Sequence, residues 1–183
     1  MLEELDLHDA TCVLDVGGGT GSLACGIAQR YPGVQADVYD QPSNRADAAR
    51  KIAALGLSDR CAFIGGNIFA SVPSGYGLYT IKHVLHDWDD ANAAAILGGI
   101  ARAMAPDARL LIVESLLDRP FEGMEAEPGY LHTRNIEQQM WTPGRVRTLP
   151  EFATLCAQAG LAIEQVTHSR IVDISYLRCV PKN

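Results

Sequence analysis

The chain has 183 residues, 48% of them hydrophobic and 20% charged, which is ordinary for one globular domain with a sizeable core. A formal net charge of −7, with no run of Lys or Arg, argues against a nucleic-acid-binding surface. No segment approaches the roughly 18 apolar residues of a membrane span, and the first residues do not resemble a signal peptide. We therefore expect neither nucleic acid nor membrane among the partners.

Five cysteines are scattered along the chain, without a C-x-x-C motif and without pairing with histidines. A disulfide framework or a zinc site would show closer or more regular spacing. The pattern therefore predicts reduced, mostly buried thiols in a cytoplasmic protein. The residues are Cys12, Cys25, Cys61, Cys156 and Cys179.

Short apolar runs of strand type alternate with segments of helical periodicity. The expected strands are Cys12–Val16, Val34–Tyr39, Cys61–Ile64, Leu78–Ile81, Arg109–Glu114, Ala162–Thr167 and Ile174–Cys179. The expected helices run from Thr20 onward, over Asn44–Leu55, over Ala91–Met104, and from the T-x-x-E capping signal Thr148–Glu151 to Gly160. This alternation predicts an α/β domain, with a largely parallel sheet and helices on both faces. Because no helix separates the last two strands, we expect them to pair antiparallel.

One stretch, Phe121–Thr142, is polar and poor in strand signal. An irregular segment of this length ahead of a capped helix is usually functional. We therefore expect it to contribute to the working surface of the protein.

The segment Val13–Gly21 reads VLDVGGGTG and places glycines at a strand-to-helix turn, where a backbone without Cβ atoms can approach a ligand closely. Gly17, Gly19 and Gly21 form G-x-G-x-G, which differs from the G-x-G-x-x-G of dinucleotide folds and lacks the lysine of a P-loop. A glycine turn of this kind suits a ligand with a carboxylate and an adenosine but no pyrophosphate, such as S-adenosylmethionine (SAM). The alternative is a tight turn that binds nothing.

A second acid, Asp40, ends the next strand, 19 positions after Gly21. An acid about 20 residues past such a turn can accept hydrogen bonds from both ribose hydroxyls. Alternatively, Asp40 caps the turn that it forms with Gln41 and Pro42. Together with the glycine turn at this distance, the spacing favours ribose binding.

The segment Lys82–Asp90 reads KHVLHDWDD and follows the fourth expected strand. Ligands of open parallel sheets lie at the carboxyl ends of strands, so this loop borders the same crevice as the glycine turn. His86 is the candidate for proton transfer, because histidine titrates near neutral pH and this one lies a helical turn beyond Lys82. His83 can equally be a packed or surface residue.

The acids of this loop have a plainer interpretation, which is capping and dipole pairing ahead of the next helix, and it accounts for Asp89 and Asp90. A metal site formed by His83, His86, Asp87 and Asp89 is a further alternative. No additional partner follows at a recognisable spacing, and we expect no metal.

Taken in order, these motifs resemble the catalytic domain of class I SAM-dependent methyltransferases. Within that class the chain is similar to the O-methyltransferase branch that includes plant caffeic acid, bacterial polyketide and hydroxyindole enzymes. The resemblance runs from about Cys12 to Cys179 and rests on LDVGGGTG, Asp40, FIGGNIF (63–69), KHVLHDWDD (82–90) and RLLIVE (109–114). It implies a Rossmann-like fold, with a mostly parallel seven-stranded sheet and an antiparallel last strand.

The resemblance also implies roles for single residues. Gly17 and its neighbours would hold the methionyl end of SAM, Asn67 and Ile68 would flank the adenine, and His86 would be the general base, oriented by Glu114. The implied cofactor-binding residues are Asp15, Gly17, Gly19, Gly21, Asp40, Gln41, Asn67, Ile68 and Lys82.

The chain departs from the family pattern at three places. Asn67 stands where the family has Asp, although its amide carbonyl can still accept from the adenine amino group. Val146 stands where the family often has a Glu that helps to fix the base, so Glu114 would orient His86 alone. The polar segment Asn135–Trp141 replaces an apolar substrate-lining run, which points to a more polar acceptor or to altered chemistry.

We therefore expect residues 1–183 to form a single SAM-binding catalytic domain without the family's N-terminal dimerisation domain; a full-length form would be a homodimer. The expected reaction is methyl transfer from SAM to a hydroxyl, in particular a phenolic one, of a small natural-product-like molecule, with S-adenosylhomocysteine as product. The alternatives are a SAM-binding homologue that catalyses a conversion other than methyl transfer, and a non-catalytic partner subunit.

Overall fold

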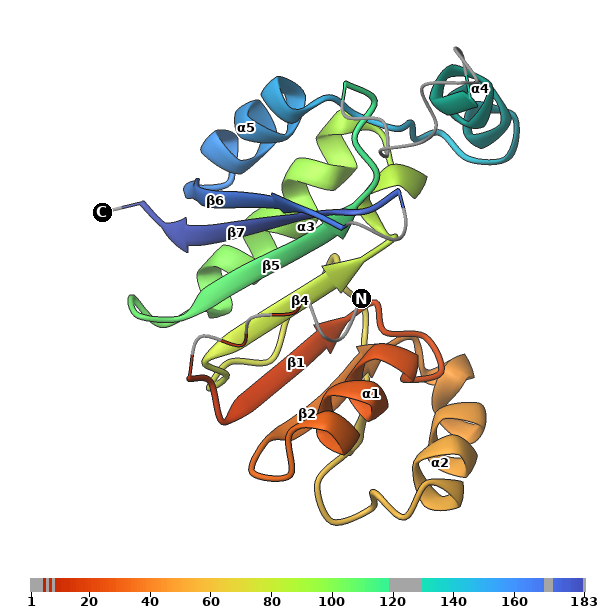
Figure 1. Ribbon diagram of the computed structural model, residues 1–183, viewed down its shortest axis with the longest axis vertical. Helices are drawn as coiled ribbons and strands as arrows, with labels where there is room; N and C mark the ends of the chain where they lie inside the picture. Colours follow the sequence, from red (N-terminus) through yellow and green to blue (C-terminus); the bar gives the residue numbers. More distant parts are fainter. Residues whose placement is uncertain (1–4, 6, 8, 119–129, 170–172, 183) are drawn as a thin grey trace.

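The computed structural model describes residues 5, 7, 9–118, 130–169 and 173–182 (Figure 1). The strands are β1 (Cys12–Val16), β2 (Gln35–Asp40), β3 (Phe63–Gly65), β4 (Leu78–Lys82), β5 (Arg109–Glu114), β6 (Leu161–His168) and β7 (Ser175–Pro181). The helices are α1 (Ser22–Arg30), α2 (Arg45–Ala54), α3 (Asp90–Ala103), α4 (Tyr130–Trp141) and α5 (Leu149–Gln158). Two short 3-10 turns, η2 (Pro42–Asn44) and η3 (Leu85–Asp87), follow β2 and β4.

The strands of the described residues form one seven-stranded sheet in the order β3-β2-β1-β4-β5-β7-β6. Neighbours from β3 to β5 pair parallel, whereas β7 pairs antiparallel with both β5 and β6. The predicted parallel sheet with an antiparallel last strand is therefore confirmed. The order reverses at β1 and β4, and the carboxyl ends of β1, β2, β3 and β4 meet at one edge, where ligands of open α/β sheets bind.

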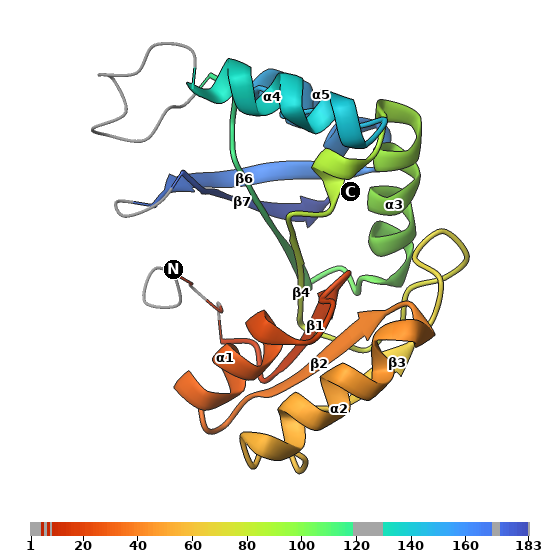
Figure 2. The ribbon, with the colours of Figure 1, turned by 90° about the vertical axis from the view of Figure 1, so that its right-hand side faces the viewer.

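Two apolar clusters cover the two faces of the sheet. Alternate residues of β1 and β5 point to opposite sides, so Leu14 and Ile112 join one cluster while Val13 and Val113 join the other. The first cluster packs α3 and α5 against the sheet, and the second packs α1 and α2. Helices on both faces, as predicted, thus hold the strand ends rigidly in place. Figures 1 and 2 show α4 at the same end of the molecule as α5, far from α2.

The helix α4 was not predicted. Its sequence carries no continuous apolar stripe, and Ile136, Met140 and Trp141 are exposed. Polar side chains hold it instead, because Asn135 accepts from the backbone N–H of Val146 at 2.8 Å. Residues 121–129 of the stretch that was expected to be irregular lie outside the described residues.

Two further expectations can be compared with the fold. The predicted capping box at α5 is present, since Thr148 and Glu151 exchange side-chain-to-backbone hydrogen bonds. All five cysteines are free thiols, and four of them are buried, as expected. Within the described part of the chain, no helix combines the length and the hydrophobicity that crossing a bilayer would require.

Candidate active site

A cavity of about 590 Å³ opens at the carboxyl ends of β1, β2, β3 and β4, a size typical of small-molecule sites. Five of the predicted cofactor residues line it, and they come from three separate loops: Gly17, Asp40, Gln41, Asn67 and Ile68. The rest of the lining consists of Tyr39, Pro42, Gly66, Phe69, His83, Val84, Asp87 and Trp88. The topology thus brings together residues that lie up to 71 positions apart in the chain.

Asp40 ties the end of β2 to the glycine turn. Its Oδ2 accepts from the backbone N–H of Gly19 at 2.7 Å, and its Oδ1 accepts from the backbone N–H of Gln41 and from Asn44 Nδ2. Asp40 therefore caps its own turn, as one of the two sequence interpretations predicted, and it also lines the cavity. Gly19 and Gly21 are not part of that lining, and both have positive φ angles, of 57° and 81°.

Gly17 lies where the cavity meets a smaller one of about 160 Å³. Its φ is 71°, and a Cβ added there would come within 2.6 Å of a methyl group of Val84, so only glycine fits. Asp15 and Lys82 line this smaller cavity. Gly17 is thus shared by both cavities, at a point where an added side chain would meet Val84.

Asp15 is buried beneath the glycine turn. Burial raises its pKa to about 7, although the hydrogen bond from Thr80 at 2.8 Å and the charge of Lys82 act in the opposite direction. Neutral and ionised Asp15 therefore coexist near neutral pH, and a cationic group in the smaller cavity would favour the ionised form.

Asn67, at the position where the family has Asp, uses its amide carbonyl locally. The Oδ1 atom accepts from the backbone N–H of Phe69 at 3.0 Å. The side-chain NH₂ group is therefore the part of Asn67 best placed to donate toward a ligand.

His86 and Glu114 form a close contact, although neither residue is part of the lining of either cavity. His86 Nδ1 lies 2.6 Å from Glu114 Oε2, and Glu114 Oε1 accepts from the backbone N–H groups of Val84 and Leu85. Glu114 is 1% exposed. Its burial disfavours the charged form, but interactions with His83 and His86 outweigh this effect and lower its pKa to about 2.

This pairing fixes the tautomer of His86. An ionised carboxylate only accepts hydrogen bonds, so Nδ1 carries the proton, and Nε2 of the neutral ring is then the basic nitrogen. Nε2 lies 3.6 Å from Oδ1 of Asp87, a residue that lines the larger cavity. The basic nitrogen therefore lies near a residue of the cavity lining, while His86 itself is not part of that lining.

His83 lies at the same carboxylate, with its Nδ1 3.5 Å from Glu114 Oε2. Its φ of 52° is unusual for a residue with a side chain, and such backbone strain clusters at functional sites. His83, His86 and Glu114 each have one atom that could ligate a metal ion, and these three atoms lie within 4.8 Å of one another. The spacing of the motif did not reveal Glu114 as the third member of this cluster.

The sequence analysis missed the aromatic wall of the cavity. Phe69 and Trp88 meet edge to face, with ring centroids 4.8 Å apart, and both line the cavity. A tryptophan inside the KHVLHDWDD motif was the available signal. Such a wall suits a flat aromatic ligand.

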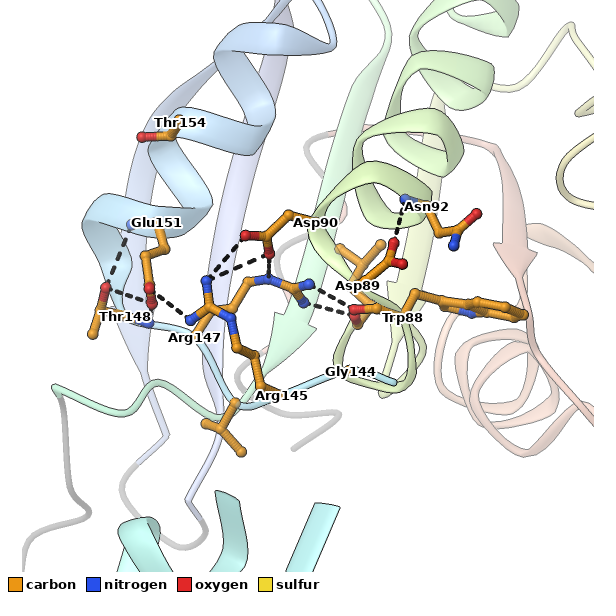
Figure 3. A network of polar contacts seen from close by, with 12 residues as sticks. Trp88, Asp89, Asp90, Asn92, Gly144, Arg145, Arg147, Thr148, Glu151 and Thr154 are labelled. Atoms are coloured by element: carbon orange, nitrogen blue, oxygen red, sulfur yellow. Dashed lines mark hydrogen bonds and ion pairs between the residues drawn. The ribbon is translucent and has the colours of Figure 1, made fainter. Parts of the chain in front are cut away.

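The acids that follow His86 have different roles. Asp89 caps α3 by accepting from the backbone N–H of Asn92 at 2.8 Å, as predicted. Asp90 lies in the first turn of α3, as the dipole interpretation predicted, and it has a further role, because its carboxylate also accepts from Arg145 and Arg147, which lower its pKa despite partial burial (Figure 3).

Of the three departures from the family pattern, Asn67 lines the larger cavity, whereas the other two lie in α4 and between α4 and α5. Val146 is buried and offers His86 no second carboxylate. In the segment 135–141, Gln138 donates to Asp87 Oδ1 at 2.7 Å, whereas Glu137 and Gln139 are exposed. The lining of the larger cavity includes no residue of this segment.

Comparison with known proteins identifies the family of this chain. Residues 1–162 match the family model of the O-methyltransferase domain. The mitomycin biosynthesis 6-O-methyltransferase of Streptomyces lavendulae is 36% identical over 160 residues, which cover 87% of this chain and 44% of that protein. The aclacinomycin 10-hydroxylase of Streptomyces purpurascens is 35% identical over 152 residues, which cover 82% of this chain and 40% of that protein.

Among solved structures, an O-methyltransferase from neocarzinostatin biosynthesis, in complex with SAM and 2-hydroxy-5-methyl naphthoic acid, is similar with a TM-score of 0.86 and 29% identity. The match covers 98% of this chain and 51% of that one. The chain thus spans about half the length of the relatives it matches. With the family model matching most of its residues, the chain belongs to the O-methyltransferase domain family, whose cofactor is SAM.

Proposed function

We propose that this chain is the catalytic part of a SAM-dependent O-methyltransferase that acts on a phenolic hydroxyl of a small natural-product-like molecule. The observation that carries the proposal is the contact of 2.6 Å between His86 Nδ1 and the ionised Glu114, with Nε2 of His86 3.6 Å from Asp87, a residue of the aromatic-walled cavity. Family membership and the names of the relatives support the reaction class.

The residues present fit the cofactor. Asp40 and Gln41 at the end of β2 would hold the ribose, while Gly17, Asp15 and Lys82 border the chamber for the methionyl end. Ile68 and Asn67 would flank the adenine. When bound, SAM supplies an electrophilic methyl group.

The contribution of the protein is alignment and removal of a proton. Phe69 and Trp88 would hold the aromatic ring of the acceptor, so that its hydroxyl faces Nε2 of His86. As that oxygen attacks, His86 takes its proton, which adds about 10²–10⁴-fold to the rate. The charge that develops on the imidazolium is stabilised by Glu114, which is ionised and buried.

The test is to incubate the protein with SAM and a panel of hydroxylated aromatic compounds, and to analyse the products by mass spectrometry. We expect a product in which one hydrogen is replaced by a methyl group, and S-adenosylhomocysteine in equal amount. A His86→Gln variant should bind SAM as the wild type does but turn over about 10²–10⁴-fold more slowly. Wild-type turnover by this variant would refute the role of the base.

A second candidate function keeps the cofactor but not the transfer. One relative of similar identity is named as a hydroxylase, and Val146 removes an acid that the family often carries. In the same experiment, this function predicts a changed acceptor with SAM recovered intact.

A further inference from the structure

Arg147 is a charged residue with almost no contact with solvent. It is 1% exposed, and it lies between α4 and α5, one residue before the cap of α5. A buried guanidinium is costly unless its N–H groups are hydrogen-bonded. The hydrogen bonds of its guanidinium therefore show how this charge is accommodated in the interior.

The guanidinium donates to three acceptors, and Figure 3 shows two of the residues that supply them, Trp88 and Asp90. Nη1 donates to the carbonyl of Leu85 at 2.7 Å, Nη2 to the carbonyl of Trp88 at 2.6 Å, and Nε to Asp90 Oδ1 at 2.9 Å. Leu85 and Trp88 lie on either side of the η3 residues His86 and Asp87. The planar fork of one arginine thus holds the turn that carries His86 at both of its ends.

The same turn is held from its other side by Glu114. The backbone N–H of Leu85 donates to Glu114 Oε1, while the carbonyl of Leu85 accepts from Arg147. The two peptide groups on either side of Leu85, the residue before His86, are therefore fixed by a carboxylate at the N–H and by a guanidinium at the carbonyl. Rotation of η3 would break bonds to both charges.

A third contact closes the space behind the turn. Gly144 packs so closely that a Cβ there would overlap the backbone of His86, Asp87 and Trp88. Residues 144–147 thus form a backing segment that contacts η3 through the backbone of Gly144 and the guanidinium of Arg147.

We propose that Arg147 is a positioning residue, which fixes η3 so that the ring of His86 keeps its contact with Glu114 and its basic nitrogen faces the acceptor. This inference rests on the proposed function only for the role of His86. The geometry of η3 can be tested without turnover.

The matched control is Arg145, two residues earlier. Arg145 shares the carboxylate of Asp90 with Arg147 and donates to Glu151 Oε1 at 2.6 Å, so it belongs to the same network of charges. Its donors reach carboxylates rather than the carbonyls of η3. An effect that arises merely from weakening this network should therefore be similar in Arg145→Met and Arg147→Met.

The direct readout is the proton NMR signal of the His86 Nδ1–H group, which a hydrogen bond to a buried carboxylate shifts downfield and protects from exchange. The signal is assigned by its loss in His86→Gln. We expect it to be present in Arg145→Met, lost or broadened in Arg147→Met, and partly restored in Arg147→Lys, because an ammonium can reach one carbonyl but lacks the fork.

Turnover provides the second readout. A displacement of the base by about 1 Å can cost on the order of 100-fold in rate, so we expect kcat of Arg147→Met to fall by about 10- to 100-fold, with SAM affinity changed less than about threefold. Arg145→Met should stay within about threefold of the wild-type kcat.

Two results would overturn the proposal. One is a folded Arg147→Met protein that keeps the Nδ1–H signal; the other is an equal loss of signal in Arg145→Met. If Arg147→Met does not fold, Gly144→Ala tests the proposal instead, because an added Cβ must displace η3. This variant should lose the Nδ1–H signal of His86 if the backing segment sets the geometry of η3, and a retained signal would overturn the proposal. Should His86→Gln turn over normally, the role of the base fails, while the NMR comparison still tests the positioning.

Discussion

The substitution Glu114→Gln tests the tautomer of His86. Glutamine has the same shape as glutamate, but only one of its two terminal groups can accept hydrogen bonds. The backbone N–H groups of Val84 and Leu85, at 3.1 and 3.0 Å, need an acceptor, so they select the amide oxygen. The NH₂ group must then face Nδ1 of His86, across the contact that measures 2.6 Å in the wild type.

Because the direction of this hydrogen bond is reversed, the imidazole of His86 should change to the other neutral tautomer. An NH₂ group donates, so Nδ1 must accept, and the proton of the neutral ring moves to Nε2. That nitrogen can then no longer take a proton from the acceptor. A comparable carboxylate-to-amide change in the Ser-His-Asp triad lowers kcat by about 10⁴ through the wrong tautomer. We expect a loss of about 10³–10⁴-fold here, with SAM affinity within about threefold, because Glu114 lines neither described cavity.

The assay compares initial rates at saturating SAM for two phenols of different acidity. The more acidic phenol arrives partly ionised, so its rate should fall less than that of the weaker acid. Glu151→Gln is the control, because Glu151 is also an acid of a charged network but caps α5 instead of contacting His86. A folded Glu114→Gln protein that keeps turnover within about threefold of the wild type for both phenols would refute the tautomer argument.

Three further predictions concern the cofactor site and stability. Asp40→Asn should weaken SAM binding by roughly ten- to a hundredfold in calorimetry, since a charge-assisted bond is worth about 1.5–3 kcal/mol; equal affinities would remove Asp40 from the site. Gly19→Val should abolish SAM binding in a folded protein, because its φ of 57° is strained for any branched side chain; normal binding would show that the turn is only structural. Because the folded-state pKa of Glu114 is about 2, against an ordinary 4.5, its stabilisation, on the order of 3 kcal/mol, is present above pH 4.5 and lost as the pH falls toward 2. Urea unfolding at a series of acidic pH values should show this loss in the wild type but not in Glu114→Gln.

The parts of the fold that were predictable from sequence are those with a local signal. β5 is an uninterrupted apolar run, and it spans Arg109–Glu114 in both the prediction and the structure. The glycine turn and the cap of α5 also rest on short-range chemistry. Helix α4 lacks such a signal, since side-chain hydrogen bonds to distant backbone hold it in place of an apolar stripe.

The residues of the site also differ in whether the sequence could predict them. Residues at or just after strand ends, such as Gly17 and Asp40, could be placed because topology alone brings strand ends together. Glu114 was assigned only through resemblance, because no spacing links it to His86, 28 positions earlier. The sequence did not indicate that Arg147 is buried, because an arginine beside a helix cap is usually exposed. Its burial depends on tertiary contacts with residues 85–90, which are distant in the chain.

The support of His86 has a physical logic that does not depend on the acceptor. With Val146 in place of a second acid, Glu114 is the carboxylate that contacts Nδ1 of the ring, and further support comes through the backbone of η3. Glu114 accepts from N–H groups at the start of the turn, while Arg147 donates to carbonyls at both of its ends. Neither residue lines the larger cavity, whose walls include Phe69 and Trp88. Substitutions in these walls can therefore adapt the cavity to another acceptor without moving the base. The relatives of this chain are named for different small molecules, which agrees with such a separation.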